Sequence, residues 1–192
     1  MEKKYTYIVV FLLIFSSIVF VGTEINEGYM MHEPIRIDSD SEFHNTATSE
    51  DWNGTGTSVD PYIIENYEID GNGTDDCFYI GNTTVHFVFK NNYFHNSSEG
   101  LSLPGLFLNN VTNGIIENNT FSGNDRGIRL NNSDENVLRY NNITGNTVGL
   151  FMTESDNNTI DSNDVYGNSA QGMWLHAENY FNDVIGNKLD GT

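Results

Sequence analysis

A short unit that begins with glycine recurs four times in the second half of the chain. It is Gly-Leu-Phe-Leu at 105–108, Gly-Ile-Arg-Leu at 127–130, Gly-Leu-Phe-Met at 149–152 and Gly-Met-Trp-Leu at 172–175. Successive copies are 22, 22 and 23 residues apart. A period this short, made of brief alternating runs between Gly and Asn corners, predicts a solenoid whose coils bury apolar side chains only by stacking on their neighbours.

Alignment of the four copies predicts an all-β chain with three short strands in each coil. Apolar residues recur at alternate positions, as expected of strands with one buried face. The first strand supplies two inward columns: Leu106, Ile128, Leu150, Met173 and Leu108, Leu130, Met152, Leu175. The other two strands supply one column each: Ile116, Leu138, Ile160, Val184 and Phe121, Ile143, Val165, Leu189. An earlier, slightly longer coil fits the same scheme with Phe78, Ile80, Val88 and Phe94.

One column of asparagines lies two residues before the third apolar column. Its members are Asn92, Asn119, Asn141, Asn163 and Asn187. Asparagine tolerates left-handed backbone geometry, and a stacked row of its amides can form hydrogen bonds between successive coils. We interpret these five residues as a structural ladder at one corner of the solenoid.

The N-terminal part divides into two segments before the repeats begin. Lys3 and Lys4 precede an apolar run that extends to Val21, so residues 1–23 are expected to be a signal peptide or a membrane anchor. Either alternative places the remainder outside the cytoplasm, secreted or held at the cell surface. Residues 24–60 are polar and aperiodic and are expected to cap the solenoid, which then occupies 61–192 as about five to six coils. Because the sequence stops inside a repeat, we expect either a fragment of a longer protein or a solenoid that docks its last coil on a partner.

The charge of the chain excludes one class of partner. Eight Lys and Arg stand against 27 Asp and Glu, which gives a formal net charge of -19. Nucleic acids and anionic lipid surfaces both require a positive patch, so we expect no nucleic-acid binding, and membrane contact only through the N-terminal segment. An acidic surface is compatible with cations, with neutral sugars or with solubility in a salty medium.

One outward column of the first strand is rich in aromatic residues. It contains Tyr79, Phe107, Arg129, Phe151 and Trp174. Exposed rings in a row can stack on sugar rings or be buried against a partner chain, or they can simply stabilise the sheet by stacking on one another. The five residues are therefore candidate ligand contacts, with a polysaccharide or a surface protein as the partner.

Acidic residues offer weaker candidates for metal binding and catalysis. Asp134 and Asp156 fall in the same column of consecutive coils and are candidates for a calcium site, the one cofactor that the pattern suggests; solvated turn residues are the alternative. Arg129 together with Asp125 or Asp134 could supply acid–base chemistry. These groups form no dense cluster of acids and bases, so we expect a protein without catalysis.

A column of alternating charge has a structural interpretation. Lys90, Glu117, Arg139 and Asp161 follow one another coil by coil and predict a ladder of ion pairs that holds the strand register.

Nine Asn-x-Ser/Thr sequons occur in the sequence. Asn110, Asn131 and Asn142, which are expected on the outside or in loops, are better candidate glycosylation sites than Asn118.

The repeated Gly-apolar-x-apolar and Asn-x-apolar patterns resemble the right-handed parallel β-helix repeats of pectate-lyase-like and NosD-type proteins. The resemblance covers residues 60–192, and segments 52–56, 60–64 and 69–73 look like the first coil of archaeal surface proteins of that kind. It implies a right-handed parallel β-helix. Its functional implications are a polysaccharide lyase or epimerase, or a copper maturation protein, for which residues 30–32, Met-Met-His, are the soft-ligand candidates. The reading favoured by the residues themselves is an exported surface module with a structural, adhesive or carbohydrate-contacting role.

Overall fold

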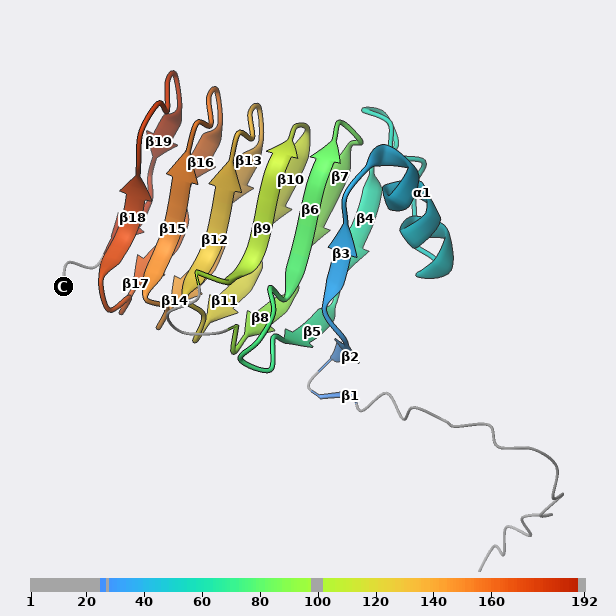
Figure 1. The fold of residues 1–192 in the computed structure, drawn as a ribbon, viewed down its shortest axis with the longest axis horizontal. Coiled ribbons are helices and arrows are strands. Elements are labelled where there is room, and N and C mark those ends of the chain that lie inside the picture. The colour runs from blue at the N-terminus through green and yellow to red at the C-terminus, as the bar shows by residue number, and fades with distance from the viewer. Residues whose placement is uncertain (1–24, 27, 98–101, 190–192) are drawn as a thin grey trace, which may run out of the picture.

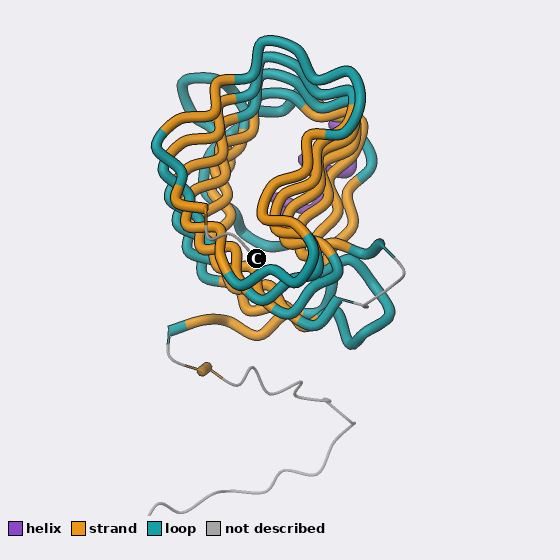
Figure 2. The backbone as a smooth tube through the Cα atoms, turned by 90° about the vertical axis from the view of Figure 1, so that its left-hand side faces the viewer, coloured by secondary structure: helices purple, strands orange, loops and turns teal. Residues whose placement is uncertain are grey.

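The computed structural model describes residues 25–26, 28–97 and 102–189. The described chain is an elongated right-handed solenoid of stacked coils (Figure 1), and a view along the stack shows strands separated by corner loops around one central core (Figure 2). Each coil contributes one strand to each of three sheets. The predicted fold class is confirmed, and residues 1–23, the expected signal or anchor, lie outside the described residues.

The three sheets have the following strands in spatial order. Sheet A contains β1 (Ile25–Asn26), β2 (Tyr29–His32), β5 (Tyr67–Asp70), β8 (Tyr93–His95), β11 (Thr120–Ser122), β14 (Asn142–Thr144), β17 (Asp164–Tyr166) and β20 (Lys188–Leu189). Sheet B contains β3 (Ile35–Ile37), β6 (Phe78–Thr83), β9 (Pro104–Val111), β12 (Arg126–Asn131), β15 (Val148–Thr153) and β18 (Gln171–Leu175). Sheet C contains β4 (Tyr62–Glu65), β7 (Phe87–Lys90), β10 (Gly114–Glu117), β13 (Val137–Arg139), β16 (Thr159–Asp161) and β19 (Asp183–Ile185). The pairing of β1 with β2 is antiparallel, and the other pairs are parallel.

The core consists of the inward columns that the repeat predicts, except on the final described coil, where Leu175, Val184 and Leu189 are 47%, 44% and 55% exposed. Leu106, Ile128, Leu150 and Met173 are partners in register across sheet B, and the columns of sheets C and A align in the same way. The glycine that opens each unit is required by close stacking, because a Cβ added at Gly127 would lie 2.7 Å from the carbonyl oxygen of Gly149.

The phase predicted for β7 is wrong. Phe89 is the partner of Ile116 and is fully buried, whereas Val88 is half-buried and faces outward. Residues 87–89 are all apolar, so the alternation of apolar and polar residues does not show which of them face inward. The strand is oriented by Lys90, which aligns with Glu117 on the outer face and forms an ion pair with Glu65 (Nζ–Oε2, 3.3 Å).

The segment expected to be a cap contributes strands as well as a cap. Strands β2 and β3 pair in parallel with β5 and β6, so the sheets begin well before residue 61. The cap itself is α1 (Asp40–Ser49). Its N-cap residue is Ser39, whose Oγ accepts a hydrogen bond from the backbone amide of Glu42 (3.1 Å). Phe43 of α1 is fully buried against the rings of Tyr62 and Phe87 and so closes the core at this end. Within the described part of the chain no helix is long and apolar enough to cross a bilayer.

The predicted asparagine column forms a continuous hydrogen-bonded row. The amide N–H of Asn119 donates to Oδ1 of Asn141 (3.0 Å), and Nδ2 of Asn141 donates to Oδ1 of Asn163 (2.9 Å) and to the carbonyl of Ile116 (2.8 Å). Asn92 and Asn187 extend the same pattern at either end. Two further asparagine columns, which the sequence comparison did not identify, do the same at other corners: Asn124, Asn146, Asn168 and Asn136, Asn158, Asn182.

Candidate functional site

The five candidate ligand contacts lie in one row on the outer face of sheet B. Register places Tyr79 beside Phe107, Phe107 beside Arg129, Arg129 beside Phe151 and Phe151 beside Trp174. The structure adds Arg36, the neighbour of Tyr79 on β3, and Arg126 at the start of β12. We call these seven residues the arginine–aromatic face. The strands that carry it lie side by side along the solenoid in Figure 1.

The guanidinium groups of this face lie over its aromatic rings. The Cζ atom of Arg36 is 3.6 Å from the ring centroid of Tyr79, and that of Arg129 is 4.4 Å from Phe107. Arg126 Cζ is 4.1 Å from the centroid of Phe151, which Arg129 also approaches at 6.0 Å. Such cation–π contacts hold a guanidinium plane against a ring while leaving the N–H groups at its edge available.

The expectation that the whole row is exposed is wrong. Tyr79 and Phe151 are only 6% and 7% exposed and Phe107 is half-buried, so Trp174, at 40%, is the one exposed ring of this row. The rings are covered by the arginines and by each other, since Tyr79–Phe107 and Phe151–Trp174 are edge-to-face pairs with centroids 5.3 and 5.2 Å apart. Trp174 lies on β18, the last described strand of sheet B, and its ring is accessible because no further strand covers it; the adjacent Leu175 is exposed as well. The arginines offer polar edges over the neighbouring Phe151 ring.

Burial changes the electrostatics of the face. Desolvation lowers the pKa of both Arg126 and Arg129, and the positive charge of Arg129 lowers that of Arg126 further. Asp76, just before β6, interacts electrostatically with Arg36 and Arg129, yet its burial raises its pKa to about 6. The alignment of the coils did not single out Asp76, because the residues at its position in later coils, Pro104, Arg126 and Val148, share no chemical character with it.

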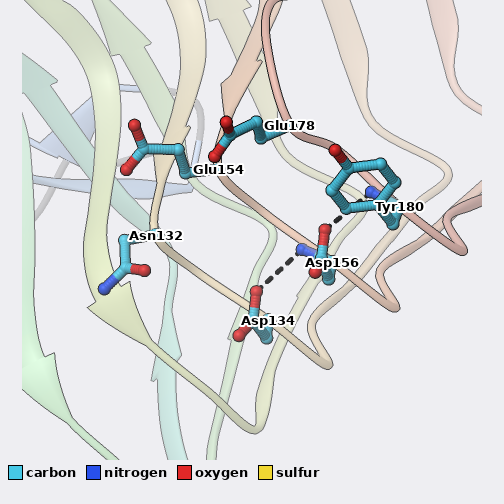
Figure 3. A pocket seen from close by; sticks show the side chains of 6 residues that line it. All are labelled: Asn132, Asp134, Glu154, Asp156, Glu178 and Tyr180. Atoms are coloured by element: carbon cyan, nitrogen blue, oxygen red, sulfur yellow. Dashed lines mark hydrogen bonds between the residues drawn. The ribbon is translucent and has the colours of Figure 1, made fainter.

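The acidic candidates lie elsewhere, in a pocket of about 240 Å³ at the turn between sheets B and C (Figure 3). Its lining consists of Asn132, Asp134, Glu154, Asp156, Glu178 and Tyr180. The two aspartates already accept hydrogen bonds from the next coil: Asp134 Oδ1 from the amide of Asp156 (2.7 Å), and Asp156 Oδ1 from that of Tyr180 (2.6 Å). Their geometry is that of residues that link successive turns.

The structure places the catalytic candidates at two locations, Asp134 at the turn pocket and Asp125 next to the strand that carries Arg129. Asp134 lines the turn pocket, whose lining does not include Arg129. Asp125 precedes β12, and its charge acts on Arg126. In the part of the chain that the structure describes, no group of three or more His, Cys, Asp or Glu side chains could hold a metal ion.

The soft-ligand candidates for copper belong to a strand and not to a loose segment. Met30, Met31 and His32 lie on β2, and His32 Nε2 is 3.2 Å from Oε2 of Glu50. Cys77 is fully buried, and burial raises the pKa of its thiol to about 12, so it is a core side chain.

The charge column forms separate ion pairs. Arg139 Nε donates to Glu117 Oε2 (2.8 Å), and Lys90 pairs with Glu65, whereas Asp161 accepts a hydrogen bond from Ser162 Oγ (2.8 Å).

Accessibility changes the order of the candidate glycosylation sites. Asn110 is exposed, but Asn131 and Asn142 are half-buried, and Nδ2 of Asn131 donates to Oδ1 of Asn109 (2.7 Å). Asn118, expected to be the poorer acceptor, is exposed. It lies at a corner with a positive φ of 54°, which turns its side chain away from the buried ladder.

Comparison with protein families gives one match, which agrees with the coil geometry. The model described as "Right handed beta helix region" matches residues 52–192, almost three quarters of the chain. Comparisons with curated proteins and with solved structures gave no match. The stacked coils, the three parallel sheets and this match together establish that the chain belongs to the right-handed beta helix family.

Proposed function

We propose that the protein is an exported surface module that binds carbohydrate through the arginine–aromatic face and that it is not an enzyme. The observation that carries the proposal is the combination of an accessible Trp174 ring with the arginines beside it. Aromatic rings stack on the apolar faces of sugars, and guanidinium groups donate hydrogen bonds to their oxygens.

The distribution of charge supports this surface as the contact. The chain has a formal net charge of -19, yet three of its four arginines lie on this one face. A local concentration of donors in an acidic protein is hard to attribute to solubility. The neighbouring strands repeat at about 4.8 Å, so the face presents its groups in a line along which an extended chain could lie.

Export is part of the same proposal. Its support is the apolar run that follows Lys3 and Lys4, a pattern typical of secretory signals and N-terminal anchors. We infer a location outside the cytoplasm, either secreted or at the cell surface.

Calorimetric titration of the purified protein with neutral and uronic-acid polysaccharides tests the proposal. We expect saturable binding that Trp174→Ala weakens at least about tenfold, because the accessible ring is lost. Trp52→Phe is the matched control, because Trp52 is 9% exposed at the capped end of the solenoid; it also leaves Trp174 as the single tryptophan for emission measurements.

Two outcomes would contradict the proposal. Near-ultraviolet absorbance that rises during the titration would show unsaturated product and therefore a lyase. Absence of binding to every polysaccharide would leave a structural module and turn attention to protein partners.

A further inference from the structure

Two buried polar atoms without a partner lie at the arginine–aromatic face. Among the described residues, the buried side-chain atoms that lack a hydrogen bond are Asp76 Oδ1, His95 Nε2, Arg129 Nε and Asn142 Oδ1. His95 Nε2 lies 3.3 Å from Oε1 of Glu68, so this atom has a polar neighbour within the protein. Asp76 and Arg129 interact electrostatically with each other, so two unsatisfied atoms of opposite character belong to one cluster. Buried polar groups are rarely left unpaired, so these two atoms call for a partner outside the described protein, a water or an ion.

The chemistry of Arg129 defines what would satisfy it. Its guanidinium is held over Phe107 and Phe151, and its Nε–H has no acceptor within the described protein. Arg126 lies three residues earlier on the same strand, over the same Phe151 ring. Each positive charge is unfavourable for the other, and an oxyanion between them would relieve that repulsion and accept hydrogen bonds from both guanidinium groups.

Asp76 is the internal carboxylate that can act on Arg129 in the same way. Its ionised form favours the charged form of Arg129, but its Oδ1 remains without a donor. It is therefore a poorly satisfied counter-ion, which a better-placed external oxyanion would displace.

We propose that Arg126 and Arg129 bind an oxyanion of the glycan, a carboxylate or a sulfate ester, and that Asp76 competes with it as the internal counter-ion. This inference rests on the proposed carbohydrate binding and specifies its ligand class and its regulation.

Competition with Asp76 makes binding depend on pH. The charged groups that act on Asp76 are Arg36 and Arg129, which favour its ionised form, and Asp75, which opposes it; Arg126 and Asp125 complete the charges of this face. Burial is the largest influence and raises the Asp76 pKa to about 6. Above this pH Asp76 is ionised and competes, and below it Asp76 is neutral and does not. Affinity for an oxyanion that keeps its charge therefore increases as the pH falls through about 6.

Three oligosaccharides of similar length separate the components of this inference. They are a glucuronic-acid oligomer, its methyl ester and a sulfated neutral oligomer, each titrated at about pH 7.5 and about pH 5. We expect the two charged ligands to bind the protein more tightly than the methyl ester does, and the sulfated ligand to bind at least about threefold more tightly at the lower pH. Preference for the carboxylate or for the sulfate identifies the source of the oxyanion.

Variants assign the effect to individual residues. Asp76→Asn should increase the affinity for charged ligands at pH 7.5 about threefold and abolish the pH dependence, with no change for the methyl ester. Asp75→Asn removes the same charge from an exposed neighbour and should leave the affinity at pH 7.5 unchanged, because Asp76 is ionised there with or without it; the pH dependence should remain and move to lower pH, since Asp75 raises the Asp76 pKa. Arg129→Gln should lower the affinity for the charged ligands at least about tenfold. Arg129→Lys, which keeps the positive charge, should lower it less.

Different failures have different meanings. If the methyl ester binds as tightly as the charged ligands, or if Asp76→Asn changes neither affinity nor pH dependence, this inference is overturned and the proposed carbohydrate binding stands. If none of the three ligands binds, both are overturned. Thermal unfolding of each variant shows whether a loss of affinity is a loss of fold.

Discussion

The corners of the solenoid explain why asparagine is so frequent in this chain. Among the described residues, nineteen other than glycine have a positive φ, and ten of them are asparagines. Asparagine tolerates this backbone conformation better than other side chains do, because its short amide can form local hydrogen bonds. At the corner after sheet B, Asn132 donates to Asn110 and Asn110 to Asn82, so these residues also link the coils.

Glu154 is an exception at this corner and leads to a prediction at the residue scale. Glu154 is the counterpart of Asn132 in the next coil and has a φ of 49°. It lines the acidic pocket together with Glu178. Glu154→Asn should increase the free energy of unfolding by about 1 kcal/mol, since it relieves backbone strain and removes one of several like charges. Denaturant unfolding measures the change. The reverse exchange, Asn132→Glu, is the control and should destabilise; a Glu154→Asn protein less stable than wild type would show that the carboxylate has a favourable contact.

The amide columns act at the scale of the element, because each asparagine joins three coils. Asn141 accepts from Asn119 and donates to Ile116 and Asn163, and it is 1% exposed. A strand of three residues such as β14 gains little stability alone. The columns therefore supply the polar contacts between coils that short strands cannot.

Asn141→Ala tests this role. It leaves the amide of Asn119 and the carbonyl of Ile116 buried without partners, and each such group costs about 1–3 kcal/mol. We expect a loss of at least about 3 kcal/mol in denaturant unfolding. Thr120→Ala, on the outer face of β11, should cost well under half of that. Equal effects of the two variants would mean that the column is not a principal source of stability.

The ion pair between β10 and β13 contributes less. Arg139→Glu would place a third carboxylate beside Glu117 and Asp161 in the register of sheet C. We expect a lower melting temperature that corresponds to about 1–2 kcal/mol, with unchanged glycan affinity, because the pair lies on a different sheet from the proposed site. The double variant Glu117→Lys/Arg139→Glu should recover only part of the loss, because it restores the pair but leaves like charges beside Lys90 and Asp161. A melting curve unaffected by Arg139→Glu would refute a role in register.

The fold was predictable because the period-2 pattern within strands agrees with the 22-residue period between coils. Both patterns must hold at once for columns such as Ile116 to Val184 to align, and chance rarely satisfies both. The prediction failed locally, at segments where one of these two patterns is missing. Residues 87–89 are all apolar, so their phase was wrong, and β3 has three residues whose partner strand β6 lies far away in the sequence.

The sequence was sufficient to predict which residues form the row of the candidate site, but not which of their rings are exposed. Alignment of coils places Phe151 beside Trp174, since it uses only register. Which rings are covered depends on side-chain directions, and the residue that covers Phe151 is Arg126, outside the aligned row. Asp76 was missed because its column, which continues with Pro104, Arg126 and Val148, contains no second acidic residue and so shows no pattern.

At the scale of the whole molecule, negative charge is distributed along an elongated body. The formal net charge is -19, and the described residues include few ion pairs of Lys or Arg to offset it: Arg36–Asp38, Lys90–Glu65, Arg139–Glu117 and Lys188–Asp164. Self-repulsion of this kind destabilises the folded state and is reduced by salt.

The thermal stability of the protein should therefore increase with ionic strength. Between about 10 mM and about 1 M NaCl the screening length falls from about 30 Å to about 3 Å, and we expect the melting temperature at neutral pH to rise by about 5 °C. The same series near pH 4, close to the sequence pI of about 4.2, is the control and should show a much smaller rise. A melting temperature that falls with salt at neutral pH would mean that attractive charge pairs dominate.

The amide columns also make the two faces of each coil different. In the columns of Asn92, Asn124 and Asn136, each backbone N–H donates to a side-chain oxygen of the next coil along the chain. Each Nδ2 group donates in the opposite sense, to a backbone carbonyl of an earlier coil. The later face of a coil therefore complements the earlier face of another coil and not a second later face, so two such solenoids could continue one another head to tail but not head to head.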